Sequence, residues 1–143
     1  MPVTKVSKEL LDMLNKAISM ELQVAIQYMW QHVQWSGVQA YAVKDAFKTV
    51  AIDEMKHAEQ IAERLFYLGG IPTTAPSAIF VGGSLKEMLL QDEKDERGAI
   101  EFYKKIITKA NAEGDDVDSR MFRKILQDEE DHHDTFESLL EGF

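Results

Sequence analysis

Hydrophobic residues recur every three or four positions along four long stretches of the chain, a spacing that places them on one side of an α-helix. The four stretches cover approximately residues 7–35, 40–68, 84–112 and 116–140. Ser7 and Ser84 stand where helix N-caps are expected, and Glu87 completes a capping box with Ser84. Glycines near positions 37, 69–70 and 114 separate the stretches. The pattern predicts an all-α protein with four helices.

The lengths of the connections predict how these helices are arranged. The breaks near Gly37 and Gly114 are short, so helices one and two, and helices three and four, are expected to be antiparallel neighbours. The connection from Ile71 to Gly83 is longer, with two prolines, two glycines and a short β-like run over residues 78–81. About 15 extended residues reach about 50 Å, farther than the roughly 42 Å of a helix of this length.

We therefore expect residues 1–143 to form a single domain, an antiparallel four-helix bundle with one long crossover between helices two and three. An up-down-up-down bundle with a loose loop is the alternative that loop length alone leaves open.

Acidic and imidazole side chains interrupt the hydrophobic faces of all four predicted helices. They are Glu21 in the first, Glu54 and His57 in the second, Glu96 in the third, and Glu129 and His132 in the fourth. Residues three positions apart share a helix face, so each Glu-x-x-His pair directs both groups the same way. These six residues are therefore predicted to lie in the core rather than on the surface.

The spacing of these residues repeats between the two halves of the chain. Glu54 lies 33 residues after Glu21, and Glu129 lies 33 residues after Glu96. Folded as two antiparallel hairpins, the chain brings four carboxylates and two imidazoles to one level of the core. Four ionised carboxylates in an apolar core need compensation, and two divalent cations would neutralise them. Oxygen-rich ligation with two imidazoles suits iron or manganese.

A second, overlapping Glu-x-x-His pair, Glu130 and His133, does not follow the 33-residue repeat. A single pair of this kind in a Glu-rich chain is more often a solvated helix face. We expect this pair on the surface or beside the site.

On these residues the sequence resembles the bacterioferritins. The resembling segments are residues 18–28, 52–58, 88–99 and 125–132, spread over most of the chain. All six di-iron ligand positions of that family are matched, and Tyr28 matches a family tyrosine beside the metal pair. The resemblance implies a ferritin-like fold and ferroxidase activity, with two iron ions per subunit and Fe(II) oxidised by O2 or H2O2 for iron storage or detoxification.

The resemblance also implies a role for each ligand. Glu54 and Glu129 would bridge the two irons, and Glu21 and Glu96 would be terminal ligands. His57 and His132 would supply one nitrogen to each iron. Tyr28 would hydrogen-bond a ligand or donate an electron; its alternative role is that of a core aromatic residue.

Met55 matches the methionine that ligates haem in this family, where two subunits each donate one Met across a two-fold axis. It lies next to Glu54, so it points off the buried face toward a neighbour or solvent. Its alternative role is that of a gap-filler at an interface. The resemblance thus implies a homo-oligomer, at least a dimer, with haem at the interface. Bacterioferritins continue into a fifth helix at the four-fold axes; this sequence stops at Phe143, which leaves the 24-subunit cage open.

Composition narrows the function classes further. There are no cysteines, which excludes disulfides, thiolate metal sites and iron–sulfur clusters. The net charge of −9 disfavours nucleic-acid partners and favours cations. No run approaches the roughly 18 apolar residues of a membrane span, and no signal-peptide pattern is present, so we expect a cytoplasmic protein without membrane contact.

Two other functions remain open at this point. One is a rubrerythrin-like di-iron protein that scavenges peroxide, although most of those carry a Cys-x-x-Cys domain that this sequence lacks. The other is a non-enzymatic dimer that binds iron or haem for a partner.

Overall fold

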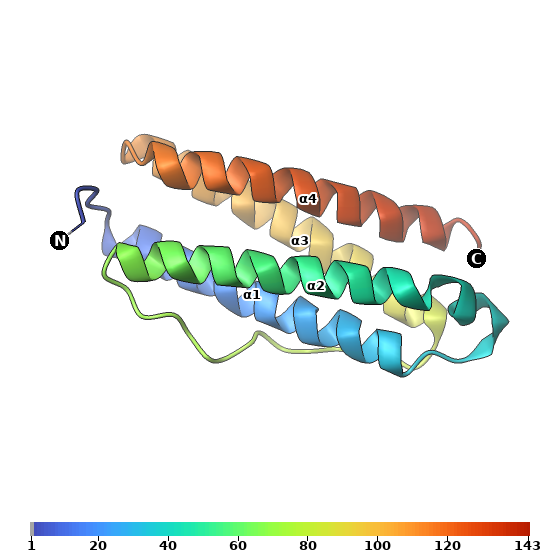
Figure 1. The fold of residues 1–143 in the computed structure, drawn as a ribbon. Helices are drawn as coiled ribbons and strands as arrows, with labels where there is room; N and C mark the ends of the chain where they lie inside the picture. The colour runs from blue at the N-terminus through green and yellow to red at the C-terminus, as the bar shows by residue number, and fades with distance from the viewer. Residues whose placement is uncertain (1) are drawn as a thin grey trace.

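The computed structural model describes residues 2–143 and contains four long helices (Figure 1). They are α1 (Lys8–Val33), α2 (Gly37–Tyr67), α3 (Leu85–Ala112) and α4 (Asp116–Leu140). No strand occurs within residues 2–143, so the β-like run at 78–81 is extended chain without a sheet partner. The prediction of an all-α protein is confirmed. None of the four helices is long and apolar enough to cross a membrane.

The helices begin and end close to the predicted positions, and the caps explain why. Ser7 Oγ accepts from the Leu10 amide at 3.1 Å, and Ser84 Oγ accepts from the Glu87 amide at 3.2 Å. At the other end of α2, Gly69 adopts a φ of 95°, which an L side chain rarely tolerates, and the next amide donates to Leu65 O. α2 begins at Gly37, three residues before the expected position 40, because Ser36 is already extended there.

The four helices form two antiparallel hairpins, α1–α2 and α3–α4, joined by a crossover that runs along the bundle (Figure 1). Side chains of α1 hold this crossover. The Asn15 side chain donates to Ile71 O and accepts from the Thr73 amide, and the Ser77 amide donates to Ser19 O. The predicted bundle with one long crossover is therefore confirmed, because the connection lies along α1 instead of looping freely.

The core consists of two hydrophobic clusters separated along the bundle. One contains the N-terminal half of α1 with the C-terminal half of α2, and includes Leu14, Ile61 and Phe122. The other contains Val24, Phe47 and residues of both other helices. Between the two clusters, every helix presents polar residues to the interior. This polar layer contains the acidic and imidazole side chains predicted from the sequence.

Candidate metal centre

Six buried acidic and imidazole side chains meet at one level of the bundle. They are Glu21, Glu54, His57, Glu96, Glu129 and His132, none more than 7% exposed. Glu54 and Glu129 belong to two overlapping groups of four residues, each with ligand atoms within 4.8 Å of one another. Glu21 and His57 complete one group, and Glu96 and His132 complete the other. The structure therefore brings together all six residues predicted from the sequence.

The inner nitrogen of each imidazole faces the carboxylates. Nδ1 of His57 lies 3.1 Å from Glu129 Oε1 and 3.3 Å from Glu54 Oε1. Nδ1 of His132 lies 3.0 Å from Glu54 Oε1 and 3.5 Å from Glu129 Oε1. Each ring thus directs one nitrogen to the point where the shared carboxylates meet.

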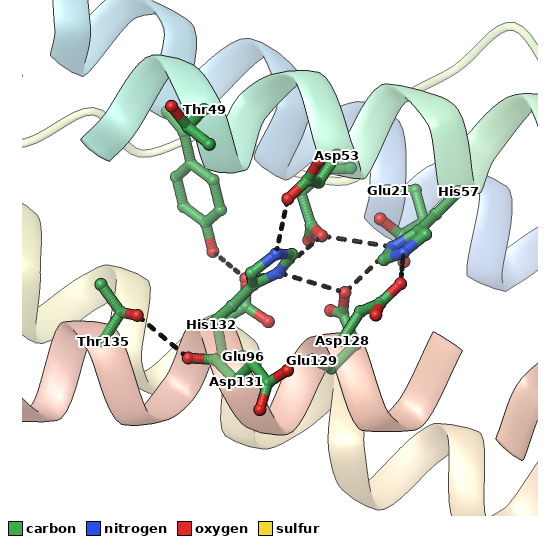
Figure 2. A network of polar contacts seen from close by, with 12 residues as sticks. Glu21, Thr49, Asp53, His57, Glu96, Asp128, Glu129, Asp131, His132 and Thr135 are labelled. Atoms are coloured by element: carbon green, nitrogen blue, oxygen red, sulfur yellow. Dashed lines mark hydrogen bonds and ion pairs between the residues drawn. The ribbon is translucent and has the colours of Figure 1, made fainter. Parts of the chain in front are cut away.

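The outer nitrogen of each imidazole is held by an aspartate from the opposite hairpin (Figure 2). Nε2 of His57 lies 2.8 Å from Asp128 Oδ2, and Nε2 of His132 lies 3.2 Å from Asp53 Oδ2. Metal-binding histidines usually donate their second N–H to a carboxylate, which fixes the tautomer and ring orientation. Both rings have this contact, so both Nδ1 atoms are left to face the centre.

Two tyrosines hold the carboxylates that are not shared. The Tyr28 hydroxyl donates to Glu96 Oε1 at 2.8 Å, and the Tyr103 hydroxyl donates to Glu21 Oε1 at 2.6 Å. Both tyrosines are fully buried. Each lies seven residues after a site glutamate on its own helix but bonds the glutamate of the other hairpin. The two halves of the site therefore have equivalent contacts.

Eight buried oxygen and nitrogen atoms of the six residues have no hydrogen-bond partner. They include both oxygens of Glu54 and Glu129, one oxygen each of Glu21 and Glu96, and Nδ1 of both histidines. Leaving so many polar atoms unpaired costs free energy, about 1–3 kcal/mol for each group. Two divalent cations would accept all of these atoms as ligands, and six such residues match the donors that iron and manganese take. The residues present therefore fit a metal pair.

The electrostatics of the site follow from crowding four carboxylates in the core. Burial first, and then the charges of Glu129 and Glu54, raise the pKa of both Glu21 and Glu96 well above the ordinary value. Burial would lower the pKa of His132, but hydrogen bonding to Glu129 and Glu54 outweighs it and raises the pKa to about 11. Without metal, protons therefore provide the positive charge that the carboxylates require.

The overlapping pair Glu130 and His133 lies outside this cluster. His133 Nε2 lies 2.9 Å from Glu93 Oε1 on the neighbouring helix α3, and Glu130 is exposed. Neither residue belongs to the groups that could hold a metal.

Met55 lies on the outer face of the α1–α2 hairpin and is 46% exposed. It lines an apolar groove of about 590 Å³ together with Met29, Trp30 and Ile52. The groove does not include any of the six metal-centre residues. The predicted position of Met55, off the buried face, is the position it has.

Sequence reasoning missed Tyr103 and the two histidine-holding aspartates as parts of the site. A signal for each was present. Asp53 and Asp128 directly precede the glutamates of the two Glu-x-x-His pairs, and Tyr103 follows Glu96 by the same seven residues that separate Tyr28 from Glu21. Extending the 33-residue comparison to these neighbours would have found all three.

Comparison with known proteins adds independent support. Residues 11–143 match the ferritin family, described as a ferritin-like domain. The chain is 35% identical over 132 residues to a bacterioferritin from Desulfovibrio desulfuricans, covering 92% of this chain and 74% of that protein. It is 31% identical to a bacterioferritin from Streptomyces coelicolor, over 93% of this chain and 80% of that protein.

Two solved structures share the fold. The X-ray structure of Desulfovibrio desulfuricans bacterioferritin, with its diiron site in different catalytic states, superposes with a TM-score of 0.81 at 33% identity, covering 93% of this chain and 78% of that one. A ferritin-like, diiron-carboxylate protein from Bacillus anthracis superposes with a TM-score of 0.90 at 28% identity, covering 93% and 96%. With its crossover bundle and its paired Glu-x-x-His helices, this chain belongs to the ferritin-like family and, within it, to the bacterioferritins.

Proposed function

We propose that this protein is a ferroxidase of the bacterioferritin type, which oxidises Fe(II) at a dinuclear centre within one subunit for iron storage or detoxification. The observation that carries the proposal is the pair of overlapping four-residue groups, with Glu54 and Glu129 common to both. Two substrate Fe(II) ions bring four positive charges to four carboxylates and two neutral imidazoles. The bound pair gives up two electrons to O2 or H2O2 as the oxidant.

The residues of the chain have distinct tasks in this reaction. Glu54 and Glu129 hold both ions, Glu21 and His57 complete one position, and Glu96 and His132 complete the other. Asp128 and Asp53 accept the outer N–H of the imidazoles, so Nδ1 carries the lone pair that faces the ion. Because these contacts fix the ligands before iron arrives, the two ions are held side by side in a dry, rigid frame.

Tyr28 and Tyr103 each engage one oxygen of a terminal glutamate and leave the other oxygen unpaired. That arrangement reserves one oxygen of Glu96 and one of Glu21 for iron. Tyr28 is also close enough to the centre, through its hydrogen bond to Glu96, to serve as an auxiliary electron donor.

The proposed ligands are tested by Glu54→Ala and His132→Ala, with His133→Ala as the matched control. Wild type and control should bind two metal ions per chain and consume O2 or H2O2 rapidly with Fe(II). The two site variants should lose paired binding and fast oxidation but keep their helical circular dichroism, because removing buried charge relieves repulsion. Unchanged oxidation in both site variants would remove the assignment. Metal analysis after purification distinguishes iron from manganese, which the same donors accept.

The same assay separates the two other functions. Consumption of H2O2 with an added reductant, but no O2 uptake with Fe(II), would indicate a rubrerythrin-like peroxide scavenger. Binding of two irons without any oxidation would indicate a non-enzymatic iron carrier.

We further propose that Met55 ligates haem at an interface between two copies of this chain. The exposed Met55 thioether beside an apolar groove of about 590 Å³ supports this, because a thioether is an axial ligand of haem iron. Protein expressed with a haem supply should show a Soret band that Met55→Leu abolishes and Met29→Leu, in the same groove, retains. Absence of the band from the wild type would overturn this proposal.

A further inference from the structure

Two cavities reach the metal centre from opposite faces of the bundle. The first, about 230 Å³, lies between α1 and α3 and is lined by all four ligand carboxylates, those of Glu21, Glu54, Glu96 and Glu129. The second, about 350 Å³, lies between α2 and α4 and is lined by His57, His132 and their aspartates. An ion arriving from solvent has these two ways in.

The cavity between α2 and α4 ends at the outer side of the imidazoles. Nε2 of His57 and Nε2 of His132 face this cavity and are bonded to Asp128 and Asp53 (Figure 2). The free Nδ1 atoms lie on the other side of the rings, toward the carboxylates. An ion on this route would have to displace hydrogen-bonded rings before meeting any unpaired ligand.

The cavity between α1 and α3 leads directly to unpaired ligand oxygens. Oε2 of Glu21 and Oε2 of Glu96 are buried without a partner, and both residues line this cavity. Gly98 lines it in the middle of α3, and a Cβ added there would meet no atom within 4 Å. Glycine inside a helix costs about 1 kcal/mol relative to alanine, and here its effect is an open gap in the wall.

A fixed carboxylate stands beside this gap. Asp95 lines the cavity and accepts amide hydrogens from Gln23, Gln27 and Gln91, the shortest of these contacts being 2.8 Å from Gln27 Nε2. Lys94 is the one basic residue among those that line the cavity, against Asp95 and the four glutamates. The path is therefore acidic from its outer end to the centre, which attracts a divalent cation.

We propose that Fe(II) reaches the centre through the α1–α3 cavity, past Asp95 and through the gap at Gly98, and not past the imidazoles. This inference rests on the proposed function, because it concerns how the same centre is filled. It assigns Asp95 to guiding the cation and Gly98 to leaving space for it. Neither residue is a ligand of the pair.

The test follows the rate of Co(II) binding, by its visible absorption, in variants that close one cavity at a time. Gly98→Leu fills the gap without strain, since the position is helical and open. It should slow Co(II) association and Fe(II) oxidation at least tenfold while still binding two ions at equilibrium. Gly98→Ala, which adds only a methyl group, should stay within about twofold of wild type. Gln60→Leu, which narrows the opposite cavity, should also leave the rate unchanged.

Asp95→Asn provides a second measurement that does not depend on filling space. Loss of its charge should slow association two- to fivefold and weaken the dependence of the rate on salt. An unchanged rate in Gly98→Leu, or a fall in Gln60→Leu instead, would overturn the route while leaving the ferroxidase assignment intact. A wild-type protein that binds no pair of Co(II) ions would remove the function, and the route with it.

Discussion

Asp128 Oδ2 lies 2.8 Å from Nε2 of His57, although the two residues belong to different hairpins. Asp53 makes the matching contact with His132 in the reverse direction, from α2 to α4. Each hairpin therefore orients the imidazole of the other. The two aspartates are roughly half exposed, so they act on the centre without being buried in it.

Asp128→Ala should weaken metal binding by about 10- to 100-fold, because His57 loses the contact that fixes its tautomer and ring orientation. Titration with Co(II) measures the change in Kd. Asp131→Ala removes a carboxylate from the same α2–α4 cavity that does not contact either imidazole, and it should leave Kd within about twofold. Equal effects of the two substitutions would show that only the charge of this face matters.

Tyr103→Phe and Tyr28→Phe should each lower the free energy of unfolding of the metal-free protein by about 1–3 kcal/mol. Each substitution leaves a buried glutamate oxygen without its hydroxyl donor. Urea unfolding followed by circular dichroism gives the difference. Tyr41→Phe, at an exposed tyrosine, should stay within about 0.5 kcal/mol of wild type. An effect of Tyr28→Phe alone would contradict the equivalence of the two contacts.

Metal binding should stabilise the fold. A ligand at 100 times its Kd stabilises by about 2.7 kcal/mol for one site, so Co(II) or Mn(II) should raise Tm and a chelator should reverse the rise. Glu54→Ala removes a ligand common to both positions and should show no metal-dependent shift in Tm. A rise in that variant equal to the wild-type rise would place the stabilising metal elsewhere.

Asp118 should make stability depend on pH at the end of the bundle. Burial first, and then its hydrogen bond with Asp115, raise the pKa of Asp118 from 3.8 to about 7. The unfolded chain loses this proton as pH passes about 4, whereas the folded chain keeps it until about 7. The stabilising contribution is therefore complete below pH 4 and is lost as the pH rises to about 7.

Asp118→Asn removes this titration, so its stability relative to wild type should increase with pH over that interval, by at most about 1.4 kcal/mol per pH unit. Urea unfolding at several pH values measures the difference between the two proteins. A difference that does not change with pH would contradict the raised pKa. The Arg64 contacts to Asp115 and Asp118, at 2.9 and 2.7 Å, are present in the wild type and hold the α3–α4 turn against α2.

The helices and the metal centre could be predicted because each rests on a repeated spacing. A three- or four-residue hydrophobic period extends over more than 20 residues in each helix, and the 33-residue interval between Glu21 and Glu54 recurs between Glu96 and Glu129. The register of two hairpins then leaves little freedom in where these side chains lie. The fold class was confirmed for this reason.

The contacts that support the centre could not be read as easily. Tyr103 follows a hydrophobic period, so by itself it indicates a core aromatic residue and not a donor to Glu21. The polar contacts between Gln27, Gln31 and Asp92 depend on how closely α1 approaches α3, which no spacing within one helix reveals. The three residues are fully buried, and their amides also bond the crossover at Phe80 and Val81.

Every group that could hold a metal includes Glu129 of the last helix. During synthesis on the ribosome, the first three helices therefore emerge without a complete set of ligands for either ion. Iron capture has to wait until α4 has been made and has folded back against its partners. A nascent chain, or one cut short before α4, cannot hold a redox-active pair, so oxidising chemistry is confined to the finished bundle.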